Sequence, residues 1–245
     1  MAEGRRRADL VLVERGLFDS RARAQEAIAA GLVTADGVPV RKASEGLSEG
    51  AEIVAGAPHP YVSRGGVKLA AALDAFGFDP KGLACLDVGA STGGFTDVLL
   101  RRGASHVHAV DVGRGQLHPD IARNPCVTSL EGTDIRHESL AVPAGSIDLV
   151  VVDVSFISLT LVLPKIVRFM RNAAQLVALI KPQFEVGREG IGRGGIVRDA
   201  ALRDASVVRV RRQAEDLGVV ITGLVPSPIT GRDGNAEFLL GARRG

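Results

Sequence analysis

The stretch Leu86-Asp87-Val88-Gly89-Ala90-Ser91-Thr92-Gly93-Gly94-Phe95-Thr96 runs from an apolar segment into a turn that is rich in glycine. Glycine lets the backbone turn sharply and approach a ligand closely, as positions 89, 93 and 94 would allow here. The turn differs from the Gly-x-Gly-x-x-Gly pattern of dinucleotide sites, and it lacks the lysine of phosphate-binding loops. The stretch therefore predicts a strand, a turn that contacts a ligand, and the start of a helix.

Strand-like and helical segments alternate outward from this stretch. Apolar runs predict strands at 83–88, 106–110, 127–130, 147–152, 176–180, 219–225 and 237–241, and helices between them at 67–76, 96–102, 161–170 and 202–217. Buried strands separated by helices indicate an α/β fold with a mostly parallel, doubly wound sheet. Ligands of such sheets bind beyond the carboxyl ends of the strands, at the switch point.

Composition excludes several other classes of protein. Hydrophobic residues make up 46% of the 245 residues and charged residues 24%, which excludes global disorder. Apolar runs stay far below the ~18–20 residues of a membrane span, and the arginine-rich N-terminus is unlike a secretory signal. The two cysteines exclude a disulfide scaffold and a cysteine-rich metal site. We expect a cytoplasmic protein without a metal ion.

The chain before the sheet forms a small separate unit. Two prolines and a glycine at residues 55–61 indicate a linker, so we divide the chain into domains 1–59 and 60–245. In the small domain we predict helices at 10–16 and 21–30, a hairpin at 32–34 and 38–40, and a strand at 52–55. Ser20 can cap the second helix and Gly31 can end it. These elements make a compact α+β domain.

Basic side chains gather at the expected helix ends and hairpin edge of the small domain. They are Arg5, Arg6, Arg7, Arg21, Arg23, Arg41 and Lys42. The whole chain carries a net charge of only +2, so a basic surface would come from local clustering. With no Trp and one Tyr, we expect RNA to be held through phosphates and shape rather than by base stacking. Alternatively, these arginines are ordinary solvated residues.

The order of residues in the small domain resembles the S-four-type RNA-binding domain. The matching stretches are Arg7-Ala8-Asp9-Leu10-Val11-Leu12-Val13-Glu14-Arg15-Gly16-Leu17, Ser20-Arg21-Ala22-Arg23-Ala24, Ile28-Ala29-Ala30-Gly31-Leu32-Val33 and Asp36-Gly37. The resemblance implies that RNA is the partner of this domain.

Carboxylates follow the next two strands of the expected sheet. Asp111, before Val112, ends a strand where an acidic residue can accept hydrogen bonds from a ribose diol. Asp134, before Ile135, could accept the amino group of an adenine, although both carboxylates could merely cap the following turns. Together with Val112, Ile135, the turn residues Gly89, Ala90, Ser91, Thr92, Gly93, Gly94 and Phe95, and Asp153, they resemble the S-adenosylmethionine site of Rossmann-type methyltransferases. This cofactor has no phosphates, which suits a turn without a basic residue.

Four charged residues are expected near the same edge of the sheet. Asp153 ends the fourth strand, Lys181 ends the fifth, and Glu237 opens the last strand, which would be antiparallel; Lys68 begins the helix before the sheet. A lysine that ends a buried strand is costly unless a carboxylate pairs with it. In this order the four resemble the Lys-Asp-Lys-Glu tetrad of FtsJ-type ribose 2′-O-methyltransferases. The alternative is two unrelated salt bridges.

The chemistry that this resemblance implies needs a base. A ribose hydroxyl is a poor nucleophile and must lose its proton as it attacks a sulfonium methyl group. A lysine made neutral by desolvation and a neighbouring cation can take that proton, and we assign this role to Lys181. Lys68 would favour the neutral form and stabilise the developing alkoxide. Asp153 and Glu237 would orient the lysines.

Further candidate RNA contacts lie beside the tetrad. Residues 187–195 contain five glycines and could close over RNA, with Arg188 and Arg193 on phosphates. The alternative for this segment is a long surface connection. Arg64, just before Lys68, is also a candidate.

The two domains together resemble the TlyA family. The resemblance covers nearly the whole chain and includes Val62-Ser63-Arg64-Gly65-Gly66-Val67-Lys68-Leu69, Asp153-Val154-Ser155-Phe156-Ile157-Ser158 and Lys181-Pro182-Gln183-Phe184-Glu185. It implies methyl transfer from S-adenosylmethionine to a cytidine ribose in ribosomal RNA, in one or both ribosomal subunits. Two alternatives stay open: a membrane-active haemolysin, after the historical label of the family, and an RNA-binding protein with an inactive methyltransferase scaffold.

Overall fold

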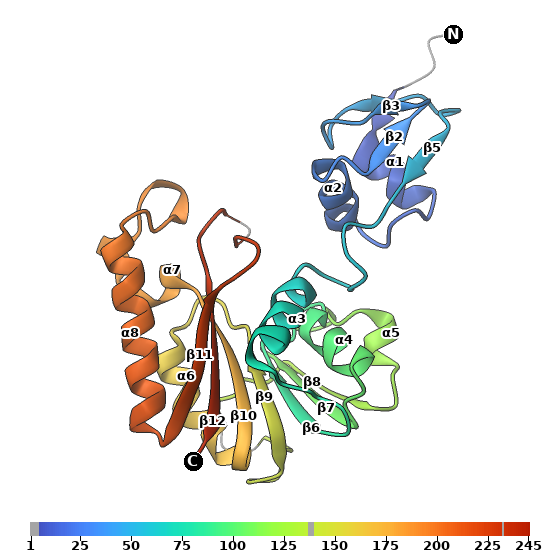
Figure 1. The fold of residues 1–245 in the computed structure, drawn as a ribbon. Helices are drawn as coiled ribbons and strands as arrows, with labels where there is room; N and C mark the ends of the chain where they lie inside the picture. Colours follow the sequence, from blue (N-terminus) through green and yellow to red (C-terminus); the bar gives the residue numbers. More distant parts are fainter. Residues whose placement is uncertain (1–4, 137–139, 232) are drawn as a thin grey trace. The chain divides into compact units, whose positions relative to one another are not determined.

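A computed structural model describes residues 5–136, 140–231 and 233–245 of the chain. It contains two compact units, Met1–Pro60 and Tyr61–Gly245 (Figure 1). Each unit has its own hydrophobic core.

The small unit packs two helices against short strands. Its elements are β1 (Arg6–Arg7), α1 (Ala8–Glu14), α2 (Arg21–Ala29), β2 (Val33–Ala35), β3 (Val38–Pro39), β4 (Gly46–Leu47) and β5 (Ile53–Ala55). The strands form a three-stranded sheet of order β3-β2-β5 and the pair β1-β4. The Ser20 side chain accepts a hydrogen bond from the backbone of Arg23, and Gly31 ends α2 with φ +71°. The predicted cap and helix end are therefore present.

Strands β1 and β4 and the first residues of α1 were not predicted from the sequence. Two-residue strands are too short to show an alternating pattern. Helix α1 begins at Ala8 because two backbone N–H groups of its first turn donate to distant carbonyls, Ala8 to Glu45 and Asp9 to Ala43. Such a non-local cap leaves no trace in the local pattern.

The large unit is a seven-stranded sheet of order β11-β12-β10-β9-β6-β7-β8. Its strands are β6 (Ala84–Val88), β7 (His106–Asp111), β8 (Val127–Glu131), β9 (Ile147–Val152), β10 (Met170–Ile180), β11 (Val219–Pro226) and β12 (Phe238–Arg244). Strands β6 to β10 run parallel, and β12 pairs antiparallel with both β10 and β11. This confirms the predicted fold class and its antiparallel last strand.

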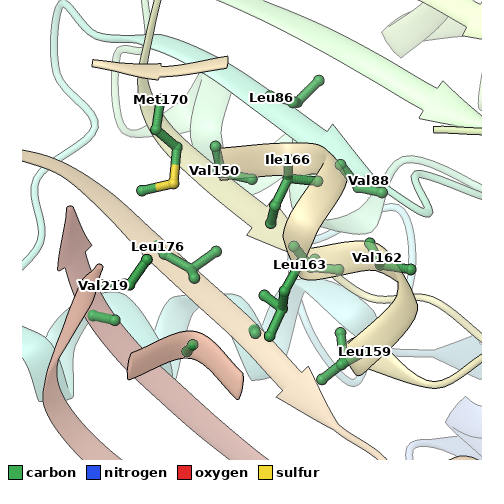
Figure 2. Close-up of a cluster of buried hydrophobic side chains, with 14 of the residues drawn as sticks. Leu86, Val88, Val150, Leu159, Val162, Leu163, Ile166, Met170, Leu176 and Val219 are labelled. Atoms are coloured by element: carbon green, nitrogen blue, oxygen red, sulfur yellow. The ribbon is translucent and has the colours of Figure 1, made fainter. Parts of the chain in front are cut away.

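Helices cover both faces of the sheet. They are α3 (Gly65–Phe76), α4 (Gly94–Arg101), α5 (Pro119–Ala122), α6 (Leu159–Ile166), α7 (Pro182–Glu185) and α8 (Ala200–Asp216), with 3-10 turns η1 (Val167–Phe169), η2 (Arg188–Gly190) and η3 (Arg193–Gly195). Helices α6 and α8 pack on one face, where Leu159, Leu163 and Ile166 meet Val150 and Leu176 (Figure 2). Helices α3 and α4 pack on the other face.

The predicted boundary between α6 and β10 was also wrong. The helix expected over 161–170 ends at Ile166, and β10 starts at Met170 instead of 176. The first part of β10 is irregular, because its register with β9 shifts between Met170 and Gln175 and Ala173 has φ +61°. This bulge leaves residues 171–173 exposed. The first part of β10 therefore lacks the continuous apolar run that is typical of a buried strand.

A close contact sets the position of α3 on the sheet. Gly223 and Gly241 are partners in the β11–β12 register. The Phe76 ring lies over both glycines, so that a Cβ atom there would come within 2.7 Å and 2.5 Å of ring atoms. Only glycine lets the last residue of α3 approach the strands so closely, which fixes the helix that carries Lys68.

We expect Gly241→Ala to lower the free energy of unfolding of the large unit by about 1–3 kcal/mol, because the added methyl group must displace the Phe76 ring. Circular dichroism in a urea series measures the change. Gly187→Ala is the matched control, since nothing lies within 4 Å of its Cβ position; it should stay within about 0.5 kcal/mol. Equal midpoints for both variants would show that the ring does not confine this position.

Candidate functional site

The turn after β6 contacts the end of β9. Gly89 has φ +88°, and a Cβ atom at this position would collide with the carbonyl oxygen of Asp153. Gly93 has φ +94° and is the residue before α4. Strands β6 and β9 are neighbours at the point where the strand order reverses, which is where ligands of doubly wound sheets bind. The predicted ligand-contacting turn therefore lies at the switch point.

Asp87 supports this turn from inside the protein. Its side chain is fully buried in β6, and the Thr96 hydroxyl of α4 donates to Oδ2 at 2.6 Å. Burial raises the pKa of Asp87 to about 7. The hydrogen bond joins the strand before the turn to the helix after it. The sequence alone predicted no role for Asp87.

Asp111, at the end of β7, binds the backbone of the turn after β6. Its carboxylate accepts hydrogen bonds from the backbone N–H groups of Ser91, at 2.8 Å, and Gly113, at 2.7 Å. The side chain remains partly exposed, and Val112 beside it is 71% exposed. A carboxylate oxygen can accept more than one hydrogen bond, so both the capping role and the predicted ribose contact are compatible with this geometry.

Asp134 and Ile135 lie after β8. The Asp134 carboxylate accepts from the backbone N–H of Arg136 at 2.9 Å and pairs with its guanidinium at 2.6 Å. Ile135 is buried in the core of the large unit. An adenine amino group would therefore share Asp134 with Arg136. The cofactor contacts expected for Asp134 and Ile135 stay predictions.

The four tetrad residues form two ion pairs. The Lys68 ammonium lies 2.5 Å from a Glu237 oxygen, and the Lys181 ammonium lies 2.6 Å from Asp153. Lys68, Lys181 and Glu237 are each less than a tenth exposed. The register pairs Ile180 with Phe238, which places Lys181 and Glu237 at adjacent strand ends. The structure thus brings together the predicted residues, whose pairing compensates their burial.

The loop after β9 is bound to the segment after β10. Ser155 accepts a hydrogen bond from the Lys181 ammonium at 2.9 Å, and the Phe156 and Phe184 rings pack with centroids 5.1 Å apart. The buried Glu185 accepts from the Ser158 hydroxyl and from the backbone of Leu159. Burial raises the pKa of Glu185. These contacts fix the loop that carries Asp153 relative to Lys181.

Phe156 is a feature that sequence analysis missed. Its side chain is 92% exposed, and its φ of +64° is unusual for a bulky residue. Non-glycine residues held in this backbone region are concentrated at functional sites, which favours a role in binding for Phe156. The signal in the sequence was an aromatic residue three positions after Asp153, inside the stretch 153–158 that resembles the TlyA family.

The predicted RNA-binding residues lie mostly at the surface. Arg5, Arg6, Arg7, Arg21, Arg41, Lys42, Arg188 and Arg193 are exposed, while Arg23 and Arg64 are partly buried. Some have partners: Arg6 pairs with Glu14, Arg7 and Arg21 pair with Asp9, and Arg64 donates to the carbonyl of Thr230. Residues 187–195 include η2 and η3. The Asn235 side chain donates a hydrogen bond to the carbonyl of Gly195, the last residue of this segment. Their contacts with RNA stay predictions.

The site fits a ligand such as S-adenosylmethionine. The turn at 89–95 contains no basic side chain and so suits a ligand without phosphates. Backbone N–H groups at the start of α4 can hold a carboxylate, and Asp111 can hold a diol. In the described ranges, no three His, Cys, Asp or Glu residues are placed to bind a metal ion. No helix of the described residues is long and apolar enough to cross a bilayer.

Two protein families match the chain. The family described as FtsJ-like methyltransferase matches residues 61–244, and the S4 domain matches residues 6–53. The predicted order of an S-four-type domain and an FtsJ-type domain is therefore confirmed.

Individual relatives cover almost the whole chain. The 16S/23S rRNA (cytidine-2'-O)-methyltransferase TlyA of Mycobacterium tuberculosis is 47% identical over 98% of this chain and 90% of its own. Hemolysin A of Brachyspira hyodysenteriae is 39% identical over 95% of this chain and 98% of its own. A solved structure from Streptococcus thermophilus, also named as a hemolysin, is 39% identical with a TM-score of 0.77, covering 99% of this chain and 90% of that one. The chain belongs to the FtsJ-like methyltransferase family and carries an S4 domain before its methyltransferase domain.

Proposed function

We propose that the chain transfers a methyl group from S-adenosylmethionine to the 2′-hydroxyl of a cytidine in ribosomal RNA, and that it does so in the cytoplasm. The observation that carries this proposal is the pair of buried ion pairs beside the glycine-rich turn. The Mycobacterium tuberculosis relative, whose name states this activity, supports the same reaction.

The turn after β6 and the residues at the ends of β7 and β8 would hold the cofactor. Backbone groups of residues 89–94 would bind its methionine part, Asp111 its ribose hydroxyls, and Asp134 with Val112 its adenine. When bound, S-adenosylmethionine supplies an electrophilic methyl group. Asp87 keeps the turn in its binding shape through the bond to Thr96.

In its neutral amine form, Lys181 would accept the proton of the ribose hydroxyl at its Nζ atom, which would make the hydroxyl oxygen the nucleophile. Asp153 and Ser155 fix the direction of this nitrogen. Lys68, held by Glu237, would stabilise negative charge on the attacking oxygen.

The exposed aromatic ring would hold the target base. Phe156 projects from the loop that carries Asp153 and rests on Phe184. Stacking on an aromatic side chain is how proteins commonly hold an unstacked RNA base. The S4 domain would bind surrounding RNA through its arginines.

Purified protein incubated with ribosomal subunits and labelled S-adenosylmethionine tests the reaction. We expect incorporation of label, and mass spectrometry of RNA fragments should locate it on a cytidine ribose. Dye release from liposomes without methyl transfer would instead support the membrane-active alternative. RNA binding without methyl transfer would support the inactive scaffold.

Lys181→Ala should lower single-turnover methyl transfer by roughly 10²–10⁴-fold and leave cofactor affinity near normal, because the base is lost while the turn after β6 and Asp111 remain. Lys181→Arg should fail as well, since a guanidinium does not release its proton. Lys81→Ala, at an exposed position before β6, is the control. Transfer within a few fold of wild type in Lys181→Ala would place the base elsewhere.

Asp111→Ala should weaken cofactor binding by about 1–3 kcal/mol, because ribose hydroxyls and two backbone N–H groups lose their acceptor. Isothermal titration calorimetry without RNA measures the affinity. Asp120→Ala, which removes a carboxylate that is 76% exposed, should leave it unchanged. Undiminished affinity in Asp111→Ala would reject the ribose contact.

Removal of residues 1–59 should lower RNA affinity and its salt dependence together, with cofactor affinity unchanged. Each phosphate contact that is lost should reduce the slope of log affinity against log salt by about 0.7–0.9. RNA binding of the intact and shortened chains over a potassium chloride series gives both quantities. Equal slopes and affinities would mean that the S4 domain does not hold RNA.

A further inference from the structure

A fully buried carboxylate lies under two of the candidate RNA-binding arginines. Asp9 is 0% exposed. Arg7 donates to both of its oxygens, at 3.0 Å and 3.1 Å, and Arg21 donates to Oδ2 at 2.9 Å. The Gln25 amide adds a bond of 2.7 Å to Oδ2. A carboxylate repels phosphate, so its place in an RNA-binding domain needs a reason.

The two guanidinium groups cover the carboxylate and face solvent. The Arg7 and Arg21 side chains are 47% and 53% exposed, although their shared partner is buried. The hydrogen bonds from Arg7, with those from Gln25 and Arg21, hold the pKa of Asp9 well below its usual range, so the carboxylate stays ionised. Two cations and one anion leave a cluster of charge +1, with N–H groups of both arginines still free of Asp9.

Asp9 is itself held firmly. It lies in the first turn of α1, where its backbone N–H donates to the carbonyl of Ala43. Arg21 and Gln25 are one turn apart on α2, so the carboxylate joins the beginnings of both helices. The neighbouring Ala8 and Ala24 are buried in the core. The arginines are thus anchored to the rigid part of the small unit.

We propose that Asp9 is a positioning residue that holds Arg7 and Arg21 next to each other as a fixed pair for neighbouring phosphates of RNA. A free arginine loses much side-chain entropy when it binds, whereas an arginine already held in place loses less. The entropy loss avoided by holding both arginines in place would outweigh the repulsion between the Asp9 carboxylate and the phosphates. This inference rests on the proposed RNA substrate.

Another ion pair of the same unit gives a matched control. Arg6 pairs with Glu14 at 2.5 Å, with both side chains about half exposed. Glu14→Gln and Asp9→Asn each remove one negative charge from the small unit. Electrostatics alone predicts tighter RNA binding for both variants. The positioning role instead predicts weaker RNA binding for Asp9→Asn, and only for this variant.

The test measures equilibrium binding of the full chain to a ribosomal RNA transcript at fixed salt. We expect Glu14→Gln to bind as tightly as wild type or more tightly. Asp9→Asn should bind roughly 5- to 100-fold more weakly, because two side chains lose their preorganisation. Cofactor affinity should stay unchanged in both variants. Unchanged or tighter RNA binding by Asp9→Asn would overturn the inference.

A double-mutant cycle separates positioning from a loss of fold. In a chain with Arg7→Gln and Arg21→Gln, Asp9→Asn should have no further effect on RNA affinity. An equal loss in that background would show that Asp9 acts through the fold, which overturns the inference. Failure of the wild-type chain to bind or methylate RNA would contradict the proposed function. A working wild type with matching Asp9→Asn and Glu14→Gln affinities would contradict only this inference.

Discussion

The register between β10 and β12 is the constraint on which the site depends. Pairing of Ile180 with Phe238 puts Lys181 and Glu237 at adjacent strand ends. A slip by one residue would turn every side chain of β12 to the other face of the sheet. The Phe76 ring over Gly223 and Gly241 opposes such a slip, because only these glycines leave room for it. The same contact fixes α3 and therefore brings Lys68 to Glu237.

Pairing explains how the protein tolerates so much charge at a buried edge. Two ammonium and two carboxylate groups sum to zero, and each lysine lies within 2.6 Å of its partner. Removal of one partner would leave an uncompensated charge, which is far more costly than the intact pair. Both the tetrad and the alternative of two salt bridges predict these ion pairs, so the catalytic role of the four residues stays a prediction.

The sequence predicted the sheet, its antiparallel last strand and the grouping of Lys68, Asp153, Lys181 and Glu237, because apolar periodicity and strand ends are local features. It could not predict β1 and β4, whose partners are distant in sequence. It also placed the start of β10 wrongly, since a bulge breaks the pattern there. The exposure of Phe156 and the burial of Asp9 depend on tertiary packing, so no local pattern reveals them.

Carboxylates serve the same purpose in both units of this protein. Asp153 and Glu237 each hold a lysine that is nearly buried, and Asp9 holds two arginines that are half exposed. Burial decides what the cation can do. The proposed base is a buried lysine shielded from water, whereas a half-exposed guanidinium keeps its charge and would contact phosphate. In the proposed mechanism, the same kind of acidic partner would support proton transfer in one unit and RNA binding in the other.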